Sequence, residues 1–320
     1  MLLSFDETAQ KIANGKLLHI AGTENLLKKL PKGNWIGGST EYFMAKEGGK
    51  ITNALLFVTE FPYDEFQIST YDGGSISSVT ADAYDNGFSI VILPFDSVVH
   101  KTYAQKAPEF EGMFIKNIAG WIAGVNLDVP GQTPVTVNGQ TCEVYTDKAI
   151  VAHVCVPDDK LVSIGIVNIF SQDETSPVIE FTEEGFSVKT CLVNGKETVF
   201  ADYVAQNGID TKFPLVGDYS GIGVNISFKF IEDSTVNFYA PVFPGIKYRM
   251  AKSITDYVAE FNGQLEKFKS AEAVFSCNCI LNFLYGELEG KDIEVFHGPI
   301  TFGEVAYQLV NQTLVYVTVL

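Results

Sequence analysis

The chain has 320 residues, of which 46% are hydrophobic and 19% are charged. This composition is typical of a folded globular protein with an ample core, in one large or two ordinary domains, and excludes a disordered chain. The formal net charge of −17 would repel phosphate groups, so we expect neither nucleic acid nor an anionic membrane as a partner.

The cysteines and the N-terminus indicate the compartment. Five cysteines are a sparse and odd set for this length, which is typical of free, mostly buried thiols in a reducing environment. The first residues contain no basic segment followed by an apolar run, and no stretch approaches the roughly 18 apolar residues that a spanning helix needs. We therefore expect a soluble, cytoplasmic protein.

The first predicted elements are short helices over residues 6–13 and 23–30, which begin with capping-type residues and space apolar positions by three or four. Next come β-branched and aromatic runs separated by Gly, Asn, Asp and Pro, a pattern that predicts strands. They cover residues 51–61, 66–71, 88–95, 149–156, 160–170, 221–230, 235–241, 273–286 and 313–320.

Two further helical patterns interrupt these strands. One, over residues 100–120, is broken by Pro108. The other, over residues 253–268, is the clearest amphipathic helix, with Ser253 as its candidate N-cap. The sequence thus predicts an α/β to α+β fold, with mixed or largely antiparallel sheets flanked by helices.

A repeated segment is also visible. "GNWIGGSTEYF" at residues 33–43 is echoed by "AGWIAGVNLD" at 119–128, and "GPITFGEV" opens a third similar segment at 298. Each copy combines a helical pattern, a Gly-rich elbow and an apolar strand. We expect the elbows to lie at equivalent strand ends, with two of them facing a shared cleft.

Several of these motifs, in this order, resemble the FIST family of small-molecule sensory domains. The similar segments are "WIGGST" (35–40), "GWIAG" (120–124), "PVFPGIKYRMA" (241–251), "VFSC" (274–277), "GPITFGEV" and "NQTLVYVTVL". The resemblance covers residues 30–320 and implies related N-terminal and C-terminal halves. A concentration of Gly, Pro and Asp near residues 205–215 places these halves at 1–210 and 211–320.

The chain also departs from the family pattern. Glu41-Tyr42-Phe43 replaces an Ala-Gly-Glu-like turn, and Ile280 stands where the family often has an Arg. That Arg would pair with a ligand carboxylate, so its loss weighs against an amino-acid-like ligand. The chain also lacks the kinase, cyclase or methyl-accepting segments that such a sensor normally feeds, so we expect a divergent, stand-alone member.

The elbows are the candidate ligand site. Consecutive glycines allow positive φ and close approach to backbone amides, and the hydroxyl groups add donors; the alternative is a tight structural turn. With the residues that the resemblance adds, the candidate ligand contacts are Gly37, Gly38, Ser39, Thr40, Gly120, Gly124, Cys277, Thr301, Gly303 and Glu304.

Two of these residues have an alternative interpretation. Glu304 could accept hydrogen bonds from a ligand, or satisfy the backbone of a neighbouring loop. Cys277 could be a nucleophile if a His lay beside it, or simply a small apolar residue of a core strand.

Cofactor patterns are weak. Cys277 and Cys279 lack a second ligand pair for zinc, and the acidic loops lack calcium-ligand spacing, so no metal is expected. Some FIST-type sensors bind haem through a His, and His153 or His297 would be the position to test; His153 otherwise fits a core histidine. No other cofactor is indicated.

The first functional hypothesis is a cytoplasmic FIST-like domain that binds a small polar metabolite between the elbows and signals to a partner protein. We expect a binding protein rather than an enzyme. The alternatives are a hydrolase or transferase using Cys277 or Ser39, and a scaffold protein without a ligand.

Overall fold

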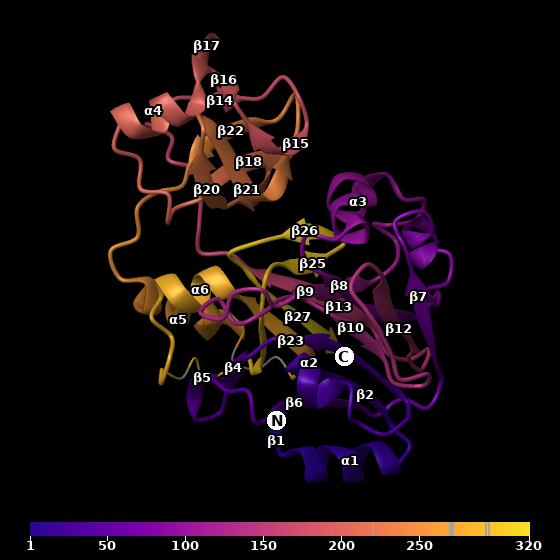
Figure 1. Cartoon of the computed structure of the whole chain (residues 1–320). Helices are drawn as coiled ribbons and strands as arrows, with labels where there is room; N and C mark the ends of the chain where they lie inside the picture. The colour runs from indigo at the N-terminus through magenta and orange to yellow at the C-terminus, as the bar shows by residue number, and fades with distance from the viewer. Residues whose placement is uncertain (220, 269–271, 292, 294) are drawn as a thin grey trace. The chain divides into compact units, whose positions relative to one another are not determined.

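A computed structural model describes residues 1–219, 221–268, 272–291, 293 and 295–320, and it divides into two compact units (Figure 1). The first unit contains Met1–Val167, Asn262–Leu309 and Thr313–Leu320, and the second contains Asn168–Phe261 with Val310–Gln312. The expected boundary near residue 210 therefore falls inside the second unit. The division in space follows an inserted segment, not the halves 1–210 and 211–320.

The first unit is built on three six-stranded sheets among the described residues, in the orders β1-β6-β2-β3-β10-β11, β26-β25-β9-β8-β12-β7 and β13-β27-β23-β24-β4-β5. Their strands are β1 (Leu2–Leu3), β2 (Leu17–Gly22), β3 (Trp35–Ser39), β4 (Tyr42–Ala45), β5 (Gly48–Ile51), β6 (Leu56–Phe61), β7 (Phe66–Tyr71), β8 (Gly87–Pro94), β9 (Ile118–Ala123), β10 (Thr136–Asn138), β11 (Glu143–Tyr145), β12 (Ala149–Cys155), β13 (Val162–Val167), β23 (Ala273–Cys279), β24 (Gly298–Thr301), β25 (Glu304–Ala306), β26 (Gln308–Val310) and β27 (Leu314–Val319). The helices are α1 (Phe5–Ala13), α2 (Glu24–Leu27), α3 (Val98–Lys106), α6 (Ile280–Tyr285) and the 3₁₀-helices η1 (Ile76–Val79) and η2 (Ala107–Glu109).

Each of the three sheets repeats one connection. A strand leads through a helix to a parallel neighbour, giving the pairs β2–β3, β8–β9 and β23–β24 through α2, α3 and α6. A later strand returns antiparallel beside the first, as β6, β12 and β27 do. The predicted repeat is thus present three times, and each Gly-rich segment lies at the end of the second parallel strand.

The three repeats also exchange strands. β10 follows β9 along the chain but pairs with β3; β25 follows β24 but pairs with β9; β4 follows β3 but pairs with β24. Each repeat therefore completes the sheet of another, which closes the three into a ring. None of the three can form its full sheet alone.

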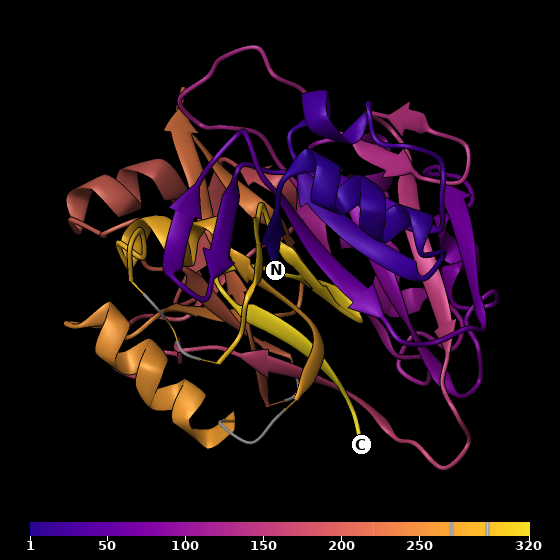
Figure 2. The same ribbon diagram turned by 90° about the horizontal axis from the view of Figure 1, so that it is seen from below.

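Helices α1 and α2 cover one face of the first sheet (Figures 1 and 2). Ser4 caps α1 in a capping box with Glu7, and Ile12 on its inner side packs into the apolar cluster of the sheet. That cluster contains Leu18, Ile20, Leu27, Leu30, Trp35, Leu56, Val58, Val135 and Val137. No helix in the described part of the chain is long and apolar enough to cross a membrane.

The second unit has its own sheets and its own aromatic core. The strand orders among its described residues are β17-β16-β14-β22-β18-β19 and β15-β21-β20. Phe200 contacts Phe181, Phe228 and Phe238. The elements are β14 (Ile179–Glu180), β15 (Gly185–Val188), β16 (Thr190–Val193), β17 (Lys196–Val199), α4 (Phe200–Gln206), β18 (Leu215–Tyr219), β19 (Ile222–Ile226), β20 (Phe228–Glu232), β21 (Thr235–Val242) and β22 (Lys247–Met250), with α5 (Tyr257–Leu265) and η3 (Glu266–Phe268) at the return to the first unit.

The predicted fold class is confirmed, because the sheets are mixed and mostly antiparallel and helices flank them. Several details of the prediction are wrong. Residues 52–55, expected within a strand over 51–61, form a loop between β5 and β6. The strand expected over 273–286 ends at Cys279 and continues as α6, since a short apolar run fits a buried helix as well as a strand. Helix α5 begins at Tyr257, so Ser253 lies too far upstream to be its N-cap.

Candidate functional site: a polar pocket at the strand ends

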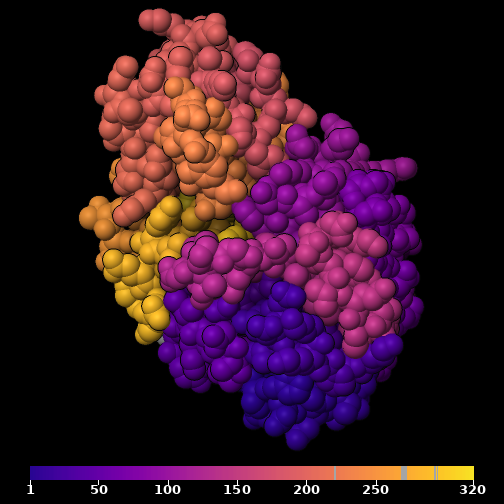
Figure 3. Space-filling model, viewed as in Figure 1, coloured from indigo at the N-terminus to yellow at the C-terminus, as the bar shows by residue number. Residues whose placement is uncertain are grey.

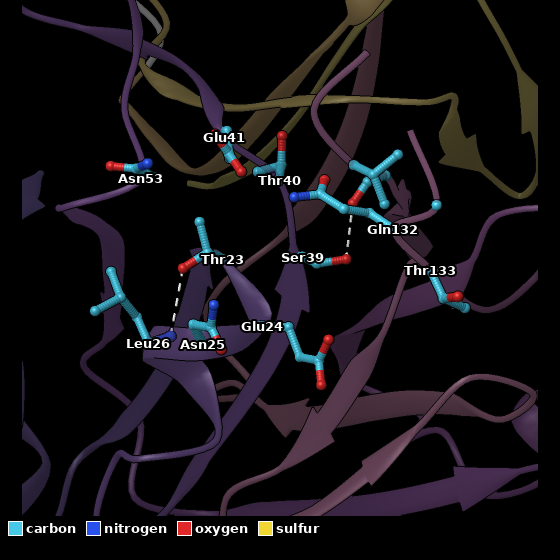
Figure 4. Close-up of a pocket in the computed structure, with 13 residues that line it drawn as sticks. Thr23, Glu24, Asn25, Leu26, Ser39, Thr40, Glu41, Asn53, Gln132 and Thr133 are labelled. Atoms are coloured by element: carbon cyan, nitrogen blue, oxygen red, sulfur yellow. Dashed lines mark hydrogen bonds between the residues drawn. The ribbon is translucent and has the colours of Figure 1, made fainter. Parts of the chain in front are cut away.

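A pocket of about 620 Å³ lies in the first unit, at the carboxyl ends of β3 and β9. Figure 4 shows Ser39 and Thr40 near its centre, Glu41 on one side, and Thr23 with Glu24 on the opposite side. The lining residues are Thr23, Glu24, Asn25, Leu26, Ser39, Thr40, Glu41, Asn53, Gly124, Val125, Gly131, Gln132 and Thr133.

Hydroxyl groups of the first elbow hold the three repeats together at the pocket floor. Ser39 Oγ donates to the carbonyl of Gly124 (2.7 Å) and accepts from the Val135 amide (2.9 Å). Thr40 Oγ1 donates to the carbonyl of Ile300 (2.8 Å). The predicted meeting of two elbows is confirmed, since Ser39, Thr40 and Gly124 all line the same pocket.

The backbone amides of the pocket floor also donate to carbonyl groups of the chain. The Ser39 amide donates to Val135, that of Thr40 to Gly22, and that of Gly124 to Ser39. We expected the elbow to offer amide and hydroxyl donors to a ligand. Instead these donors serve the chain's own carbonyl groups, so the floor presents mainly acceptor oxygens.

Glu41 is the charged group of the floor, with only 8% of its surface exposed. Its Oε2 accepts from Asn126 Nδ2 (2.9 Å), whereas no hydrogen bond from the described residues reaches Oε1. Asn126 also accepts from the Tyr42 hydroxyl (3.3 Å), and its amide donates to Gln132 Oε1 (3.0 Å). The loop of residues 124–135, which lies on the surface of the first unit (Figure 3), is thereby tied to β4 and the carboxylate.

Gly37 and Gly38 lie inside β3 and do not line the pocket. Neither has a positive φ, which corrects the reason expected for them. A Cβ on Gly38 would lie 2.6 Å from Ile92 and 2.8 Å from the Trp121 indole. The glycine is therefore required by close packing between two repeats, not by a turn.

In the second elbow, one glycine lines the pocket and another lies inside a strand. Gly124 lines the pocket, but Gly120 lies within β9, where any Cβ would overlap the carbonyl of Val91. The Gly120 carbonyl accepts from Cys277 Sγ (3.4 Å). Gly120 and Cys277 therefore belong to the core.

Glu304 is fully buried and lies outside the pocket, as do Thr301 and Gly303. Its Oε1 accepts from the Thr301 hydroxyl (2.8 Å), and its Oε2 from the Thr313 hydroxyl (2.8 Å) and amide (3.4 Å). Burial raises the pKa of this carboxyl to about 8, although these hydrogen bonds lower it in part. Glu304 thus links β25 to the start of β27. This is the second of the two interpretations of Glu304, in which the carboxyl group satisfies a neighbouring loop and not a ligand.

Cys277 is buried, with 2% of its surface exposed. Burial, with smaller contributions from Glu304 and Cys279, raises its pKa well above the usual value. A reactive thiol needs a lowered pKa and access to substrate. This environment gives Cys277 neither property.

Histidine ligation of haem finds no support at His153. Its Nδ1 bonds Ser89 Oγ (2.8 Å), its Nε2 bonds the Tyr71 hydroxyl (2.9 Å), and burial lowers its pKa to about 4. Both ring nitrogens are therefore occupied. His297 is half-buried and lies outside the pocket. Within the described residues, no three His, Cys, Asp or Glu side chains gather as metal ligands would.

Sequence reasoning missed most of the pocket wall. Glu41 was seen only as a departure from a family turn, and Thr23, Asn53, Gln132 and Thr133 were not singled out. The capping pattern at Thr23 was the available signal, because its hydroxyl accepts from the Leu26 amide (3.3 Å) at the start of α2. Residues 129–135 contain no recognisable motif, and residues 52–55 lie inside the run that predicts a strand over 51–61.

The fold and the site define this class of protein: a domain of three interlocked α/β repeats with a polar pocket between strand ends. The chain belongs to a family of unknown function, DUF6976, whose model matches residues 3–320. No curated protein and no solved structure matches it. The resemblance to FIST-type sensory domains stays a prediction.

Proposed function

We propose that this protein is a cytoplasmic sensory domain that binds a small polar metabolite in the pocket between β3 and β9. The observation that carries the proposal is the pocket itself, whose floor is buried and polar and joins two repeats. Ligands of α/β sheets commonly bind at the carboxyl ends of parallel strands. The cytoplasmic location is supported by the five free cysteines.

The signal would pass through the loop of residues 124–135. This loop supplies one wall of the pocket and is tied to the floor through Asn126. A ligand that contacts both the floor and the loop would favour the arrangement seen here, because binding shifts the populations of conformers. A separate signalling protein would then recognise the ordered loop.

Binding can be tested by isothermal titration against a panel of small polar metabolites, with native mass spectrometry to detect a ligand that co-purifies. Thr133→Trp should abolish binding, because Thr133 lies on the exposed rim and an indole would fill the entrance. Thr146→Trp, on an exposed turn away from the pocket, is the matched control. Absence of any ligand, or equal binding by both variants, would contradict the proposal.

A hydrolase or transferase has no comparable support. Cys277 is buried with a raised pKa, and the Ser39 hydroxyl donates to a carbonyl, not to a base. We therefore propose no second function.

A further inference from the structure

The chemistry of the pocket wall restricts the ligand further. The 13 lining residues include two carboxylates, Glu24 and Glu41, and no Lys, Arg or His. Lys28 approaches Glu24 from outside the pocket at 3.8 Å, and both side chains are largely exposed, so this ion pair neutralises little. An anionic ligand would meet like charge without a compensating cation.

The hydrogen-bonding capacity of the floor leads to the same conclusion. The hydroxyl protons of Ser39 and Thr40 are used by carbonyl groups, so each oxygen can offer a ligand only a lone pair. The amides of Ser39, Thr40 and Gly124 are used as well. A ligand that binds at Ser39, Thr40 and Gly124 must therefore bring the donors for these contacts itself.

Glu41 indicates that the ligand should also carry a positive charge. More than nine-tenths of the residue is buried, it faces the pocket (Figure 4), and its Oε1 has no hydrogen-bond donor among the described residues. A carboxylate oxygen that faces a pocket and has no protein donor is available to a ligand that brings a cation or a donor, and such a charge-assisted hydrogen bond is stronger than a neutral one. An ammonium group supplies both a positive charge and three donors.

We infer that the ligand of this pocket is a small organic cation, an amine or ammonium compound, whose charged end is bound by Glu41. The inference rests on the proposed binding function and specifies its ligand class. Glu24, at the more exposed side of the pocket, is placed to attract a second positive group. The net charge of −17 would also raise the encounter rate of such a ligand.

Three compounds with one carbon skeleton provide the test: 1,4-diaminobutane, butane-1,4-diol and succinate, titrated calorimetrically into the full-length protein at low salt. We expect the diamine to bind at least about tenfold more tightly than the diol, since hydrogen bonds between charged groups are stronger than neutral ones. Succinate should not bind. The affinity for the diamine should fall as salt is added, because screening weakens charge pairing.

Matched carboxamide variants locate the charge. Glu41→Gln keeps an acceptor for Asn126. It should weaken diamine binding at least about tenfold, because the neutral carboxamide cannot form the charge-assisted hydrogen bond to the ammonium group. Glu109→Gln removes an equal charge from an exposed position outside the pocket and should leave binding unchanged. Equal effects of the two substitutions would overturn the inference, as would diamine binding that survives Thr133→Trp.

The outcomes separate the ligand class from the function. If the diol or succinate binds as tightly as the diamine and Thr133→Trp abolishes this binding, the pocket is a binding site but the cationic class is wrong. The class is also wrong if the diamine fails to bind while a panel compound binds in the pocket. If neither these probes nor the panel bind, the proposed function fails too.

Discussion

At the scale of single residues, Glu304 couples stability to pH. Its carboxyl has a pKa of about 8 in the folded chain against 4.5 when exposed, so the folded state holds a proton that the unfolded state releases between these values. The stabilisation is complete below about pH 4.5 and is lost as the pH rises towards 8. When the carboxyl group is protonated, Glu304 can donate this proton to the Thr301 hydroxyl oxygen. The Thr301 hydroxyl then donates its own proton to the Asn278 carbonyl (3.2 Å).

We predict that Glu304→Gln removes this dependence, since a carboxamide mimics the protonated acid. Relative to the variant, the wild-type free energy of unfolding should fall by roughly 2–5 kcal/mol between pH 4.5 and 8, at about 1.4 kcal/mol per pKa unit. Urea unfolding at several pH values measures it. The low pKa values of His19 and His153 act in the opposite direction but cancel in this difference. Parallel pH profiles would show that Glu304 is ionised when folded.

Gly38 makes a second prediction at this scale. Gly38→Ala should destabilise the protein by about 1–3 kcal/mol, because the added methyl group overlaps Ile92 and Trp121. Gly74→Ala is the control, since its Cβ would meet only Asp72 Oδ1, at 3.5 Å. Thermal unfolding of both variants measures the effect, and equal midpoints would contradict the packing explanation.

At the scale of elements, Asn126 makes more side-chain hydrogen bonds than any other residue of the loop of residues 124–135. Asn126 bonds Glu41 through Nδ2 and accepts from the Tyr42 hydroxyl and the Asp128 amide through Oδ1. We predict that Asn126→Ala raises amide hydrogen exchange in the loop at least about tenfold, because each lost bond is worth roughly 1 kcal/mol.

Hydrogen-exchange mass spectrometry of peptides from this loop provides the measurement. Asn86→Ala removes a comparable anchor to the carbonyls of Val156 and Pro157 and should leave the loop unchanged. Unchanged exchange in the first variant would mean that backbone bonds alone fix the loop.

The elements also show what the sequence could and could not predict. Strands such as β7 and β12 were found because alternating or β-branched runs are bounded by turn residues. The sequence predicts Gly-rich elbows in the segments that form β3 and β9, since glycines usually mark turns. Their glycines instead allow close packing, of Gly38 against another repeat and of Gly120 against the neighbouring strand β8, and this depends on partners distant in the sequence.

The candidate site was predictable only in part, for the same reason. Ser39, Thr40 and Gly124 were found because they end repeated segments. Glu304 attracted attention as a lone carboxylate in an apolar run, yet Thr313, nine residues further along the chain, satisfies it. Glu41 gains its role from burial and from Asn126, neither of which the sequence shows.

At the scale of the whole molecule, the two units differ in how they are closed. In the first unit, β4, β10 and β25 each complete another repeat's sheet, so loss of one repeat would expose the edges of the others. The second unit is an insertion with a separate aromatic core. It also takes in residues 310–312, where Asn311 Oδ1 accepts from the Ser227 hydroxyl (2.7 Å) and amide (3.1 Å).

Separate cores predict that unfolding is not a single two-state transition. Both tryptophans of the chain, Trp35 and Trp121, are buried in the first unit. Tryptophan fluorescence should therefore follow the first unit alone, whereas far-ultraviolet circular dichroism follows both. The two urea transitions should not coincide.

The variant Asn311→Ala tests whether the transition seen only by circular dichroism is the unfolding of the second unit. It leaves the buried Ser227 amide without its acceptor, whereas the Ser227 hydroxyl keeps Gln312 Oε1 (2.6 Å), and the lost bond should lower the stability of the second unit by about 1–3 kcal/mol. The fluorescence transition should stay in place. Ser97→Ala is the reciprocal control, since its hydroxyl caps α3 in the first unit, and it should move the fluorescence transition. Coincident transitions that both substitutions shift equally would mean that the units unfold as one.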